Sequence, residues 1–247
     1  MNQTIDVKNL SVSYSGKKAI KDVNFSLDSG RLIGIIGPNG AGKSTLVKGM
    51  LDLEKKDSGK VRIFGKELDT IREKIAYIPQ RADIDWDFPI LVKSTVLLGR
   101  YPRLGLFKRP SKKDKKIALE ALEKVGMADF ADNQIGQLSG GQQQRVFVAR
   151  SLAQKADVYF LDEPFVGVDI QSEEIIINIL KELRDQGKTI FVIHHDLTQL
   201  ENYFDDIILI NKELFGAGPV KEVVTPELME AAFKAPLTVL ENAGGQI

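Results

Sequence analysis

The sequence predicts an α/β fold built on a mostly parallel β-sheet, and three observations support this prediction. Short apolar runs rich in β-branched residues recur along the chain, and each is too short to form a helix. An amphipathic helical pattern lies between two of these runs, so strand and helix alternate as they do around a parallel sheet. The N-terminal part instead alternates polar and apolar residues, which is typical of antiparallel strands.

The buried parallel strands are expected where the apolar runs lie, because strands covered on both faces are apolar throughout. These runs are Leu32–Ile36, Val158–Leu161, Thr189–Ile193 and Ile207–Ile210. A helix is expected over Glu173–Leu183, where Ile176, Ile179, Leu180 and Leu183 fall on one face.

Two further regions differ from this alternating core. Antiparallel strands flanking the main sheet are expected over Thr4–Leu10, Asp22–Leu27 and Val61–Phe64. No convincing strand is found between about residues 86 and 153, and Lys115–Val125 places its apolar residues on one helical face. We therefore expect a helical insertion in this part of the chain.

Composition limits the classes of protein to which the chain can belong. Its 247 residues, 43% of them apolar, suffice for one large or two closely joined globular domains. Thirty-four basic residues balance thirty-four acidic ones, so no overall charge favours nucleic acid as a partner. The absence of cysteine excludes a disulfide framework and thiolate metal sites.

Signals for membrane insertion and export are also missing from the sequence. No run approaches the roughly 18 to 20 consecutive apolar residues that cross a bilayer. Residues Met1–Leu10 lack the basic-then-apolar order of a signal peptide. We expect a soluble, unexported chain that would serve a membrane process only by docking on another subunit.

A glycine-rich loop follows the first expected parallel strand and opens a helical stretch. It matches the pattern G-x-x-x-x-G-K-[ST] and consists of Gly37, Pro38, Asn39, Gly40, Ala41, Gly42, Lys43, Ser44 and Thr45. Its glycines let backbone N–H groups turn around phosphate oxygens, and the following helix points its positive end at the same anion. Lys43 is expected to contact the β- and γ-phosphates, and the Ser44 hydroxyl to bind Mg²⁺. A plain turn is the alternative, but it needs no lysine followed by serine.

Two adjacent carboxylates, Asp162 and Glu163, end the expected strand Val158–Leu161. Neighbouring side chains on a strand point in different directions. We expect Asp162 to hold the Mg²⁺ hydration shell, and Glu163 to face the γ-phosphate and orient or deprotonate the attacking water. The alternative is that both carboxylates are helix caps or loop solubilisers.

The segment Leu138–Gln142 has the form of a helix start, because Ser139 and Gln142 match a capping box. This interpretation does not explain Gly140 and Gly141, since each glycine costs about 1 kcal/mol relative to alanine in a helix. Glycines in the first turn let a ligand approach the exposed N–H groups, and phosphate is the natural ligand there.

In their order along the chain, these motifs resemble those of the nucleotide-binding subunits of ATP-binding-cassette (ABC) transporters, and the resemblance covers nearly the whole sequence. It implies that adenine stacks on Tyr14 and that Gln80 senses Mg²⁺ and the γ-phosphate. It also implies that His195 is a switch histidine, which contacts the γ-phosphate.

The same resemblance implies a homodimer with two complete ATP sites. The signature residues Ser139, Gly140, Gly141 and Gln142 would bind the γ-phosphate held by Lys43 of the second copy. Asp169 would lie where the loop after Glu163 crosses the dimer interface.

The domain organisation implied by the resemblance is a P-loop NTPase core in a single ATP-binding-cassette domain over residues 1–240. Residues 1–85 and 154–215 would form the catalytic core with its antiparallel β subdomain. Residues 86–153 would form the inserted helical subdomain that carries the signature, and 216–240 a C-terminal helical extension. Residues 241–247 would be a loose tail.

Several single-residue assignments have competing interpretations. Tyr14 could pack on the sheet edge, and Gln80 could be a surface loop residue. The adjacent His194 and His195 could suggest a metal site, but no third ligand lies at suitable spacing. His195 fits the family pattern better than His194. Val166–Asp169 departs from the family's more usual serine-alanine-leucine-aspartate but retains the aspartate.

Some segments are more particular than the family as a whole, and they are similar to the ATPases of bacterial importers for manganese, zinc or iron. These segments are Asp85–Ile90, Gly141–Phe147, Pro164–Asp169 and His194–Leu197. Manganese is the first choice, although packing common to a broader set of importers is an alternative. The partners implied are a transmembrane permease dimer and, indirectly, an extracytoplasmic metal-binding protein. The chain would sit at the cytoplasmic face of the membrane, with a short permease helix docked near Gln80 and Asp83–Pro89.

Two rival functions share the same motifs. DNA-repair and chromosome-organising ATPases need a long coiled coil between the phosphate loop and the signature, and Lys43 and Ser139 are too close in sequence to enclose one. A soluble ABC ATPase with no role in transport is harder to exclude, and co-purification with a polytopic membrane protein would distinguish it from a transporter subunit.

Overall fold

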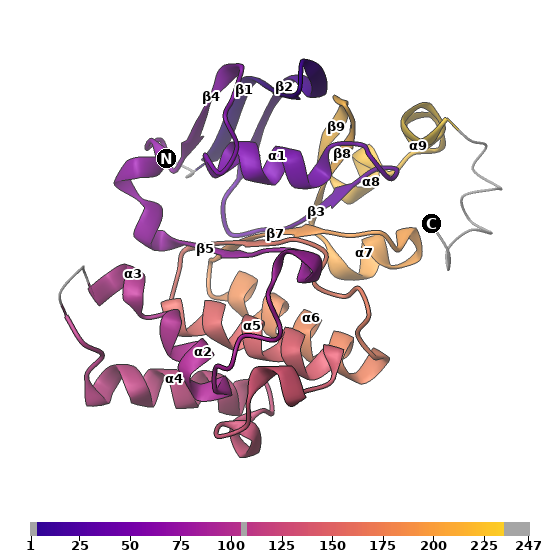
Figure 1. Cartoon of the computed structure of the whole chain (residues 1–247). Helices are drawn as coiled ribbons and strands as arrows, with labels where there is room; N and C mark the ends of the chain where they lie inside the picture. The colour runs from indigo at the N-terminus through magenta and orange to yellow at the C-terminus, as the bar shows by residue number, and fades with distance from the viewer. Residues whose placement is uncertain (1–3, 105–107, 235–247) are drawn as a thin grey trace. The chain divides into compact units, whose positions relative to one another are not determined.

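The computed structural model describes residues 4–104 and 108–234 of the chain (Figure 1). These residues divide into two compact units, each described in turn. The first unit contains the described residues up to Arg72 and from Arg184 onward, and the second spans Glu73–Leu183. The expected tail, 241–247, lies outside the described residues.

An antiparallel sheet opens the first unit, as the alternating pattern predicted. It consists of β1 (Thr4–Tyr14), β2 (Lys17–Asp28) and β4 (Ser58–Ile63) in the order β2-β1-β4. Ile5 of β1 lies opposite both Leu27 and Ile63, and all three side chains are buried. The apolar face of this sheet therefore packs into the core, while the alternate residues face solvent.

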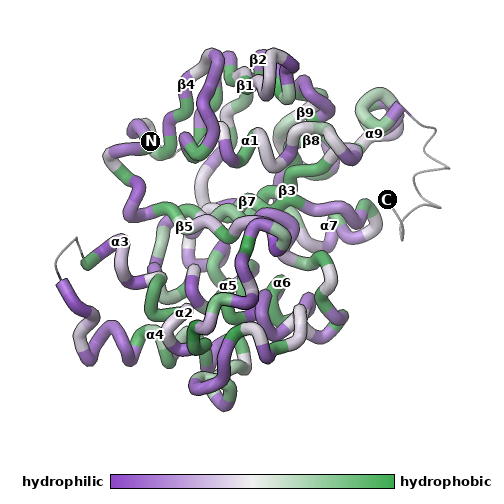
Figure 2. The backbone as a smooth tube through the Cα atoms, in the orientation of Figure 1, coloured by the Kyte–Doolittle hydropathy of each residue, from purple (hydrophilic) through white to green (hydrophobic). Residues whose placement is uncertain are grey.

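The other strands of the first unit follow the order β7-β3-β8-β9. They are β3 (Leu32–Ile36), β7 (Thr189–Ile193), β8 (Asp206–Asn211) and β9 (Glu213–Pro219). β3 pairs in parallel with β7 and β8, whereas β9 pairs antiparallel with β8. Every residue of β3 and β7 is buried, and Figure 2 shows β3 in the green of hydrophobic residues. The continuous apolar runs thus correctly indicated strands buried on both faces.

Short helices complete the first unit. They are α1 (Lys43–Met50), α7 (Leu200–Tyr203), α8 (Val220–Val223) and α9 (Pro226–Phe233), with 3-10 turns at η1 (Leu68–Thr70) and η6 (Leu197–Gln199). Helix α1 packs on β1, where a Cβ on Gly49 would lie 3.1 Å from Val12. Within the expected C-terminal extension, residues 220–223 and 226–233 are helical, whereas residues 216–219 belong to β9.

The second unit contains one pair of parallel strands and most of the helices. The strands are β5 (Ile75–Ile78) and β6 (Val158–Leu161), which pair in parallel. The helices are α2 (Val92–Leu98), α3 (Tyr101–Leu104), α4 (Lys112–Lys124), α5 (Gly140–Gln154) and α6 (Ile170–Asp185). The 3-10 turns are η2 (Arg72–Lys74), η3 (Arg81–Asp83), η4 (Ala128–Phe130) and η5 (Ile135–Gln137).

Helices α2, α4 and α5 pack against one another (Figure 1). A buried arginine links all three. Arg100, which follows α2, donates from Nε to the Asp114 carboxylate over 3.0 Å and from Nη1 to the Ala153 carbonyl over 2.6 Å. Asp114 also forms a capping box with Ser111 at the start of α4. Hydrogen bonds from Ser111, together with Arg100, lower the pKa of Asp114 to about 2. This network fixes the start of α4 relative to α5.

The expectation of a helical insertion agrees with the second unit. Between residues 86 and 153, the described part of the chain forms helices and turns and only one isolated bridge, Leu91 with Gln134. However, β5, β6 and α6 group with these helices into one compact unit. The domain boundaries expected from the sequence divide the chain differently and remain a prediction. No helix among the described residues is both long and apolar enough to span a membrane.

Candidate functional site

The glycine-rich loop joins β3 directly to α1, in the strand-loop-helix setting that the sequence predicted. Gly37 has φ 155°, and a Cβ at this position would lie only 1.9 Å from the Ile210 carbonyl oxygen. Gly42 caps α1 with φ 93°, and a Cβ there would lie 2.5 Å from Ile20. Both positions therefore require glycine, because a side chain would meet both backbone strain and a clash.

Lys43 lies over its own loop with only 6% of the residue exposed. Its ammonium group donates to the Gly37 carbonyl over 2.8 Å and to the Pro38 carbonyl over 3.1 Å. Ser44, the next residue of α1, is half-buried. Phosphate oxygens are stronger acceptors for an ammonium group than neutral carbonyls are. The loop therefore presents a cation and a hydroxyl at the start of a helix, as phosphate binding requires.

Two further predicted residues of the first unit are partly exposed. Tyr14 ends β1 with 42% of the residue exposed, so its ring is accessible for stacking. His195 follows β7 and is half-buried, whereas its neighbour His194 is only 4% exposed. His194 packs edge-on against Phe204, with ring centroids 5.4 Å apart, and burial lowers its pKa to about 4. The exposure of the two histidines favours His195 as the ligand-contacting residue, although this assignment remains a prediction.

The paired carboxylates lie at the end of β6 in the second unit. Asp162 is 1% exposed, and its backbone N–H donates to the Ile78 carbonyl over 3.0 Å. Glu163 adopts φ 53°, a left-handed conformation that is uncommon for a residue with a side chain. Such strained residues concentrate at functional sites.

Gln80 and Glu163 lie close together although they are far apart in sequence. The Gln80 side-chain amide donates to the Glu163 carboxylate over 2.6 Å. The two residues follow the parallel strands β5 and β6, whose carboxyl ends lie at the same edge. This contact counts against Gln80 as a surface loop residue. It leaves a carboxylate oriented by an amide, which is suitable for holding a water molecule.

The segment Leu138–Gln142 starts α5 with the capping box that the sequence indicated. Ser139 Oγ accepts from the Gln142 backbone N–H over 3.3 Å, and the Gln142 side chain accepts from the Ser139 N–H over 2.9 Å. Ser139 is exposed. The capping interpretation is therefore confirmed, and phosphate binding by the exposed helix start stays a prediction.

The structure gives a second reason for the two signature glycines, which sequence reasoning missed. A Cβ on Gly141 would lie 2.6 Å from the Asp169 carboxylate, and a Cβ on Gly140 would lie 2.7 Å from Arg81 Nη1. Asp169 in turn accepts from the Ser172 backbone N–H over 2.9 Å and from the Ser172 hydroxyl over 2.8 Å. These bonds lower the pKa of Asp169 and anchor its loop to the start of α6. The glycines thus allow two other segments to pack on the start of α5.

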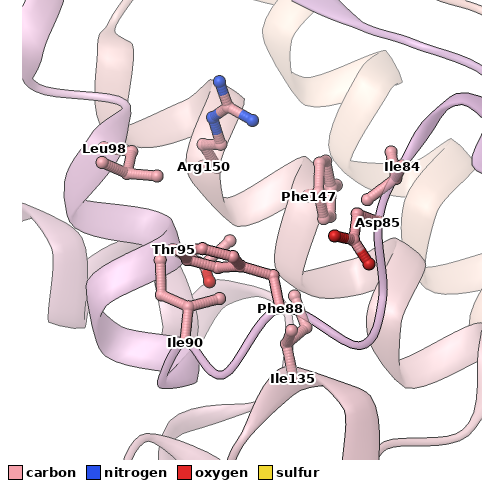
Figure 3. A pocket seen from close by; sticks show the side chains of 9 residues that line it. All are labelled: Ile84, Asp85, Phe88, Ile90, Thr95, Leu98, Ile135, Phe147 and Arg150. Carbon is pink, nitrogen blue, oxygen red and sulfur yellow. The ribbon is translucent and has the colours of Figure 1, made fainter.

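An apolar groove lies on the second unit (Figure 3). Its lining residues come from the segment after η3, from α2, η5 and α5: Ile84, Asp85, Phe88, Ile90, Thr95, Leu98, Ile135, Phe147 and Arg150. Phe88 is 59% exposed, which is unusual for a large apolar side chain. The cavity measures about 220 Å³, less than the 300–1,000 Å³ typical of small-molecule sites. It therefore suits a few side chains of a docked segment better than it suits a nucleotide.

Residues 20–166, more than half of the chain, match the family model described as ABC transporter. The chain belongs to the ABC transporter family. It is an ATP-binding and ATP-hydrolysing subunit of a transport system.

Curated members of the ABC transporter family match over nearly their full length. The chain is 53% identical to the manganese transport system ATP-binding protein MntB of Halalkalibacterium halodurans, covering 98% of this chain and 96% of the relative. It is 49% identical to MntB of Bacillus subtilis, covering 96% and 95%. It is 47% identical to the zinc transport system ATP-binding protein TroB of Treponema pallidum, covering 93% and 86%.

Solved ABC transporter structures share the fold. An ABC transporter in an inward-facing conformation matches with a TM-score of 0.83 at 28% identity, covering 96% of this chain and 90% of that one. An isolated ATP-binding cassette, MJ1267, matches with a TM-score of 0.78 at 26% identity, covering 93% and 98%. The predicted α/β fold, with its antiparallel N-terminal sheet and helical subdomain, is thereby confirmed.

Proposed function

We propose that this chain energises a bacterial importer for a divalent transition metal, with manganese as the first choice and zinc or iron as the next. The observation that carries this proposal is the near full-length similarity to relatives named for manganese and zinc transport. Two histidines and no cysteine offer no dedicated transition-metal cage in the chain itself. Ion selectivity is therefore assigned to the partners.

The phosphate loop binds the triphosphate in this proposal. Backbone N–H groups of residues 37–45 surround the phosphates, and Lys43 adds a positive charge on the β- and γ-phosphates. Ser44, Asp162 and Gln80 supply hydroxyl, carboxylate and amide oxygens, the hard ligands that Mg²⁺ prefers, so the residues present fit this ion. When bound, Mg²⁺ neutralises charge on the phosphates.

Hydrolysis is assigned to the carboxylate that the structure shows held by an amide. Glu163 accepts a proton from the attacking water, and Gln80 keeps its carboxylate oriented. His195 contacts the γ-phosphate, and adenine stacks on Tyr14, whose ring is partly exposed.

Two copies are needed for complete sites. The exposed start of α5, with Ser139, Gly140, Gly141 and Gln142, binds the γ-phosphate held by the other copy, and Asp169 lies at their interface. ATP binding closes this homodimer, and hydrolysis reopens it. ATP can shift the conformation of an attached membrane protein only if it binds the closed homodimer more tightly than the open one.

A transmembrane permease dimer is the proposed direct partner, and an extracytoplasmic metal-binding protein is the indirect one. The apolar groove receives a short cytoplasmic segment of the permease. Figure 3 shows Asp85 and Arg150 on opposite sides of Phe147, so the groove carries one charge of each sign beside an apolar floor. The chain is peripheral at the cytoplasmic face of the membrane, and nucleic acid is not among its partners.

Metal uptake tests this function directly. Cells lacking the chain should lose accumulation of radioactive manganese from low external concentration, and the wild-type chain should restore it, whereas Glu163→Gln should not. Zinc and iron uptake are measured in parallel. A loss of zinc uptake alone, or of iron uptake alone, would show that this ion and not manganese is the transported ion. Unchanged uptake of all three, together with no polytopic membrane protein co-purifying, would indicate an ABC ATPase without a role in transport.

A further inference from the structure

Arg81 has no part in the roles above, yet its side chain is anchored to the start of α5. It follows Gln80 directly and begins η3. Its Nη2 donates to the Gln143 side-chain oxygen over 2.9 Å. Gln143 is buried in α5 and is held in turn by the Ile135 carbonyl, to which it donates over 3.2 Å. The bond is therefore made to a fixed acceptor in the first turn of α5.

The same guanidinium lies against two backbone segments with proposed roles. A Cβ on Gly140 would lie 2.7 Å from Arg81 Nη1, and a Cβ on Gly167 would lie 3.4 Å from the same atom. Gly140 belongs to the signature, and Gly167 to the loop between Glu163 and Asp169. A movement of the Arg81 side chain would therefore change the packing of both segments.

Trp86 connects Arg81 to the groove. The indole N–H of Trp86 donates to the Arg81 carbonyl over 3.0 Å, and the guanidinium carbon lies 5.6 Å from the centre of the Trp86 ring. Trp86 packs edge-on against Phe147, with ring centroids 5.3 Å apart, and Phe147 lines the groove (Figure 3). A segment seated in the groove would therefore contact Phe147, against which Trp86 and then Arg81 are packed.

Electrostatics makes Arg81 sensitive to an anion as well. Among the residues that the structure describes, no carboxylate forms an ion pair with Arg81. The N-terminal end of a helix also disfavours a nearby cation. A phosphate bound at the start of α5 would pair with the Arg81 guanidinium and offset the repulsion between this cation and the helix N-terminus. The position of the Arg81 side chain would therefore respond to an anion at the start of α5. Through Trp86 and Phe147 it would also respond to a segment bound in the groove.

We propose that Arg81 is a positioning residue that links occupancy of the groove to the start of α5 and to the Gln80–Glu163 pair. The proposal rests on the proposed function, in which the groove binds a permease segment and the signature binds nucleotide held by a second copy. Coupling between two sites is reciprocal. Nucleotide binding must therefore also change the surroundings of Trp86.

Trp86 is the single tryptophan of the chain, so tryptophan fluorescence reports on its surroundings, which include Arg81 and Phe147. The full-length chain is titrated with Mg²⁺ and the non-hydrolysable analogue AMP-PNP while Trp86 emission and acrylamide quenching are recorded. The variants are Arg81→Ala and Arg81→Lys, of which lysine keeps the charge but lacks the planar fork. The matched control is Arg103→Ala, since Arg103 is an arginine of the same unit that donates to the Lys155 carbonyl and does not line the groove.

The wild type and Arg103→Ala should show a nucleotide-dependent emission change, and both Arg81 variants should lose it. Radiolabelled ATP binding should stay within about twofold of the wild type, while the kcat of hydrolysis falls about tenfold or more because the reacting groups are misplaced. The variant Gln143→Leu removes the acceptor but keeps the arginine, and should lose the emission change too.

Two results would overturn the proposal: an emission change that persists in the Arg81 and Gln143 variants, or a wild-type chain that binds nucleotide without any change at Trp86. A wild-type chain that binds no ATP would instead contradict the proposed function. If the Arg81 variants do not fold, as judged by circular dichroism, Gln143→Leu decides alone.

Discussion

The side-chain amide of Gln80 donates a 2.6 Å hydrogen bond to the carboxylate of Glu163, which lies 83 positions further along the chain. The two residues follow neighbouring parallel strands, β5 and β6. The bond fixes one oxygen of the Glu163 carboxylate and so sets the direction of the side chain.

Replacing Glu163 with glutamine keeps the size of the side chain but removes its basicity. Turnover of ATP should fall by about 10²- to 10⁴-fold, while ATP binding persists and the chain accumulates as a dimer. Turnover assays and size-exclusion chromatography measure these effects. Glu174→Gln, which makes the same change at an exposed position of α6, is the control. Normal turnover in Glu163→Gln would remove this residue from its proposed role.

The variant Ser139→Arg tests the role of the α5 start in the second copy. A bulky cation there should abolish hydrolysis and leave the ATP affinity of the dilute monomer nearly intact. Ser139→Ala is the companion variant, because it removes the cap at a cost of about 1 kcal/mol without adding bulk. If Ser139→Arg hydrolyses ATP at the normal rate, the signature does not meet a partner's nucleotide.

Arg150, which lines the groove, is expected to contribute to recognition of the permease. Arg150 forms no ion pair among the described residues, and desolvation lowers its pKa, so an acceptor from a docked permease segment would stabilise its charge. Arg150→Glu should reduce co-purification with the membrane subunit by about tenfold or more and leave ATP binding by the isolated chain unchanged. Lys112→Glu, at an exposed position outside the groove, should have no effect. Equal losses in both variants would argue against the groove as the docking site.

Glycine at position 37 is required by space as well as by backbone conformation. Gly37→Ala should lower the free energy of unfolding by about 3 kcal/mol or more, because its Cβ would clash with the Ile210 carbonyl. Gly40→Ala, in the same loop, has φ 74° and open space, so it should cost only about 1 kcal/mol. Urea denaturation of both variants checks the difference. Equal losses would show that the close contact at Gly37 relaxes without cost.

His194 should make stability depend on pH. Its pKa is lowered from 6.5 to about 4 by burial, so the unfolded chain binds the proton more readily than the folded one. This contribution is fully present above pH 6.5 and is lost as the pH falls toward 4, with a slope of up to about 1.4 kcal/mol per pH unit. Denaturation at pH 7.5 and pH 5 should show a smaller loss for His194→Gln than for the wild type. His195→Gln, which keeps His194, should behave as the wild type does.

The sequence predicted the buried strands best, because position and composition agree there. The bounds of β3, β6 and β7 coincide with the apolar runs. Strand β5 was missed because it is only four residues long and is followed directly by a proline. Strand β9 was missed because its glycines and proline make the sequence resemble a loop.

Sequence patterns alone nominate candidate site residues where one local segment carries the expected chemistry, as in the phosphate loop and the paired carboxylates. The contacts of Gln80 with Glu163, Gly140 with Arg81 and Gly141 with Asp169 join segments far apart in sequence. Such contacts depend on how β5, β6 and α5 pack, which local patterns do not specify.

The backbone of Glu163 is left-handed, with φ 53°. Glycine would adopt φ 53° without strain, so folding alone would select glycine at this position. The chain instead carries glutamate, whose carboxylate we propose as the base that accepts a proton from the attacking water. Selection for thermal stability alone should therefore favour glycine at position 163 and yield stable chains that no longer hydrolyse ATP. Retention of glutamate under selection would then report that ATP hydrolysis, and not only stability, is being selected.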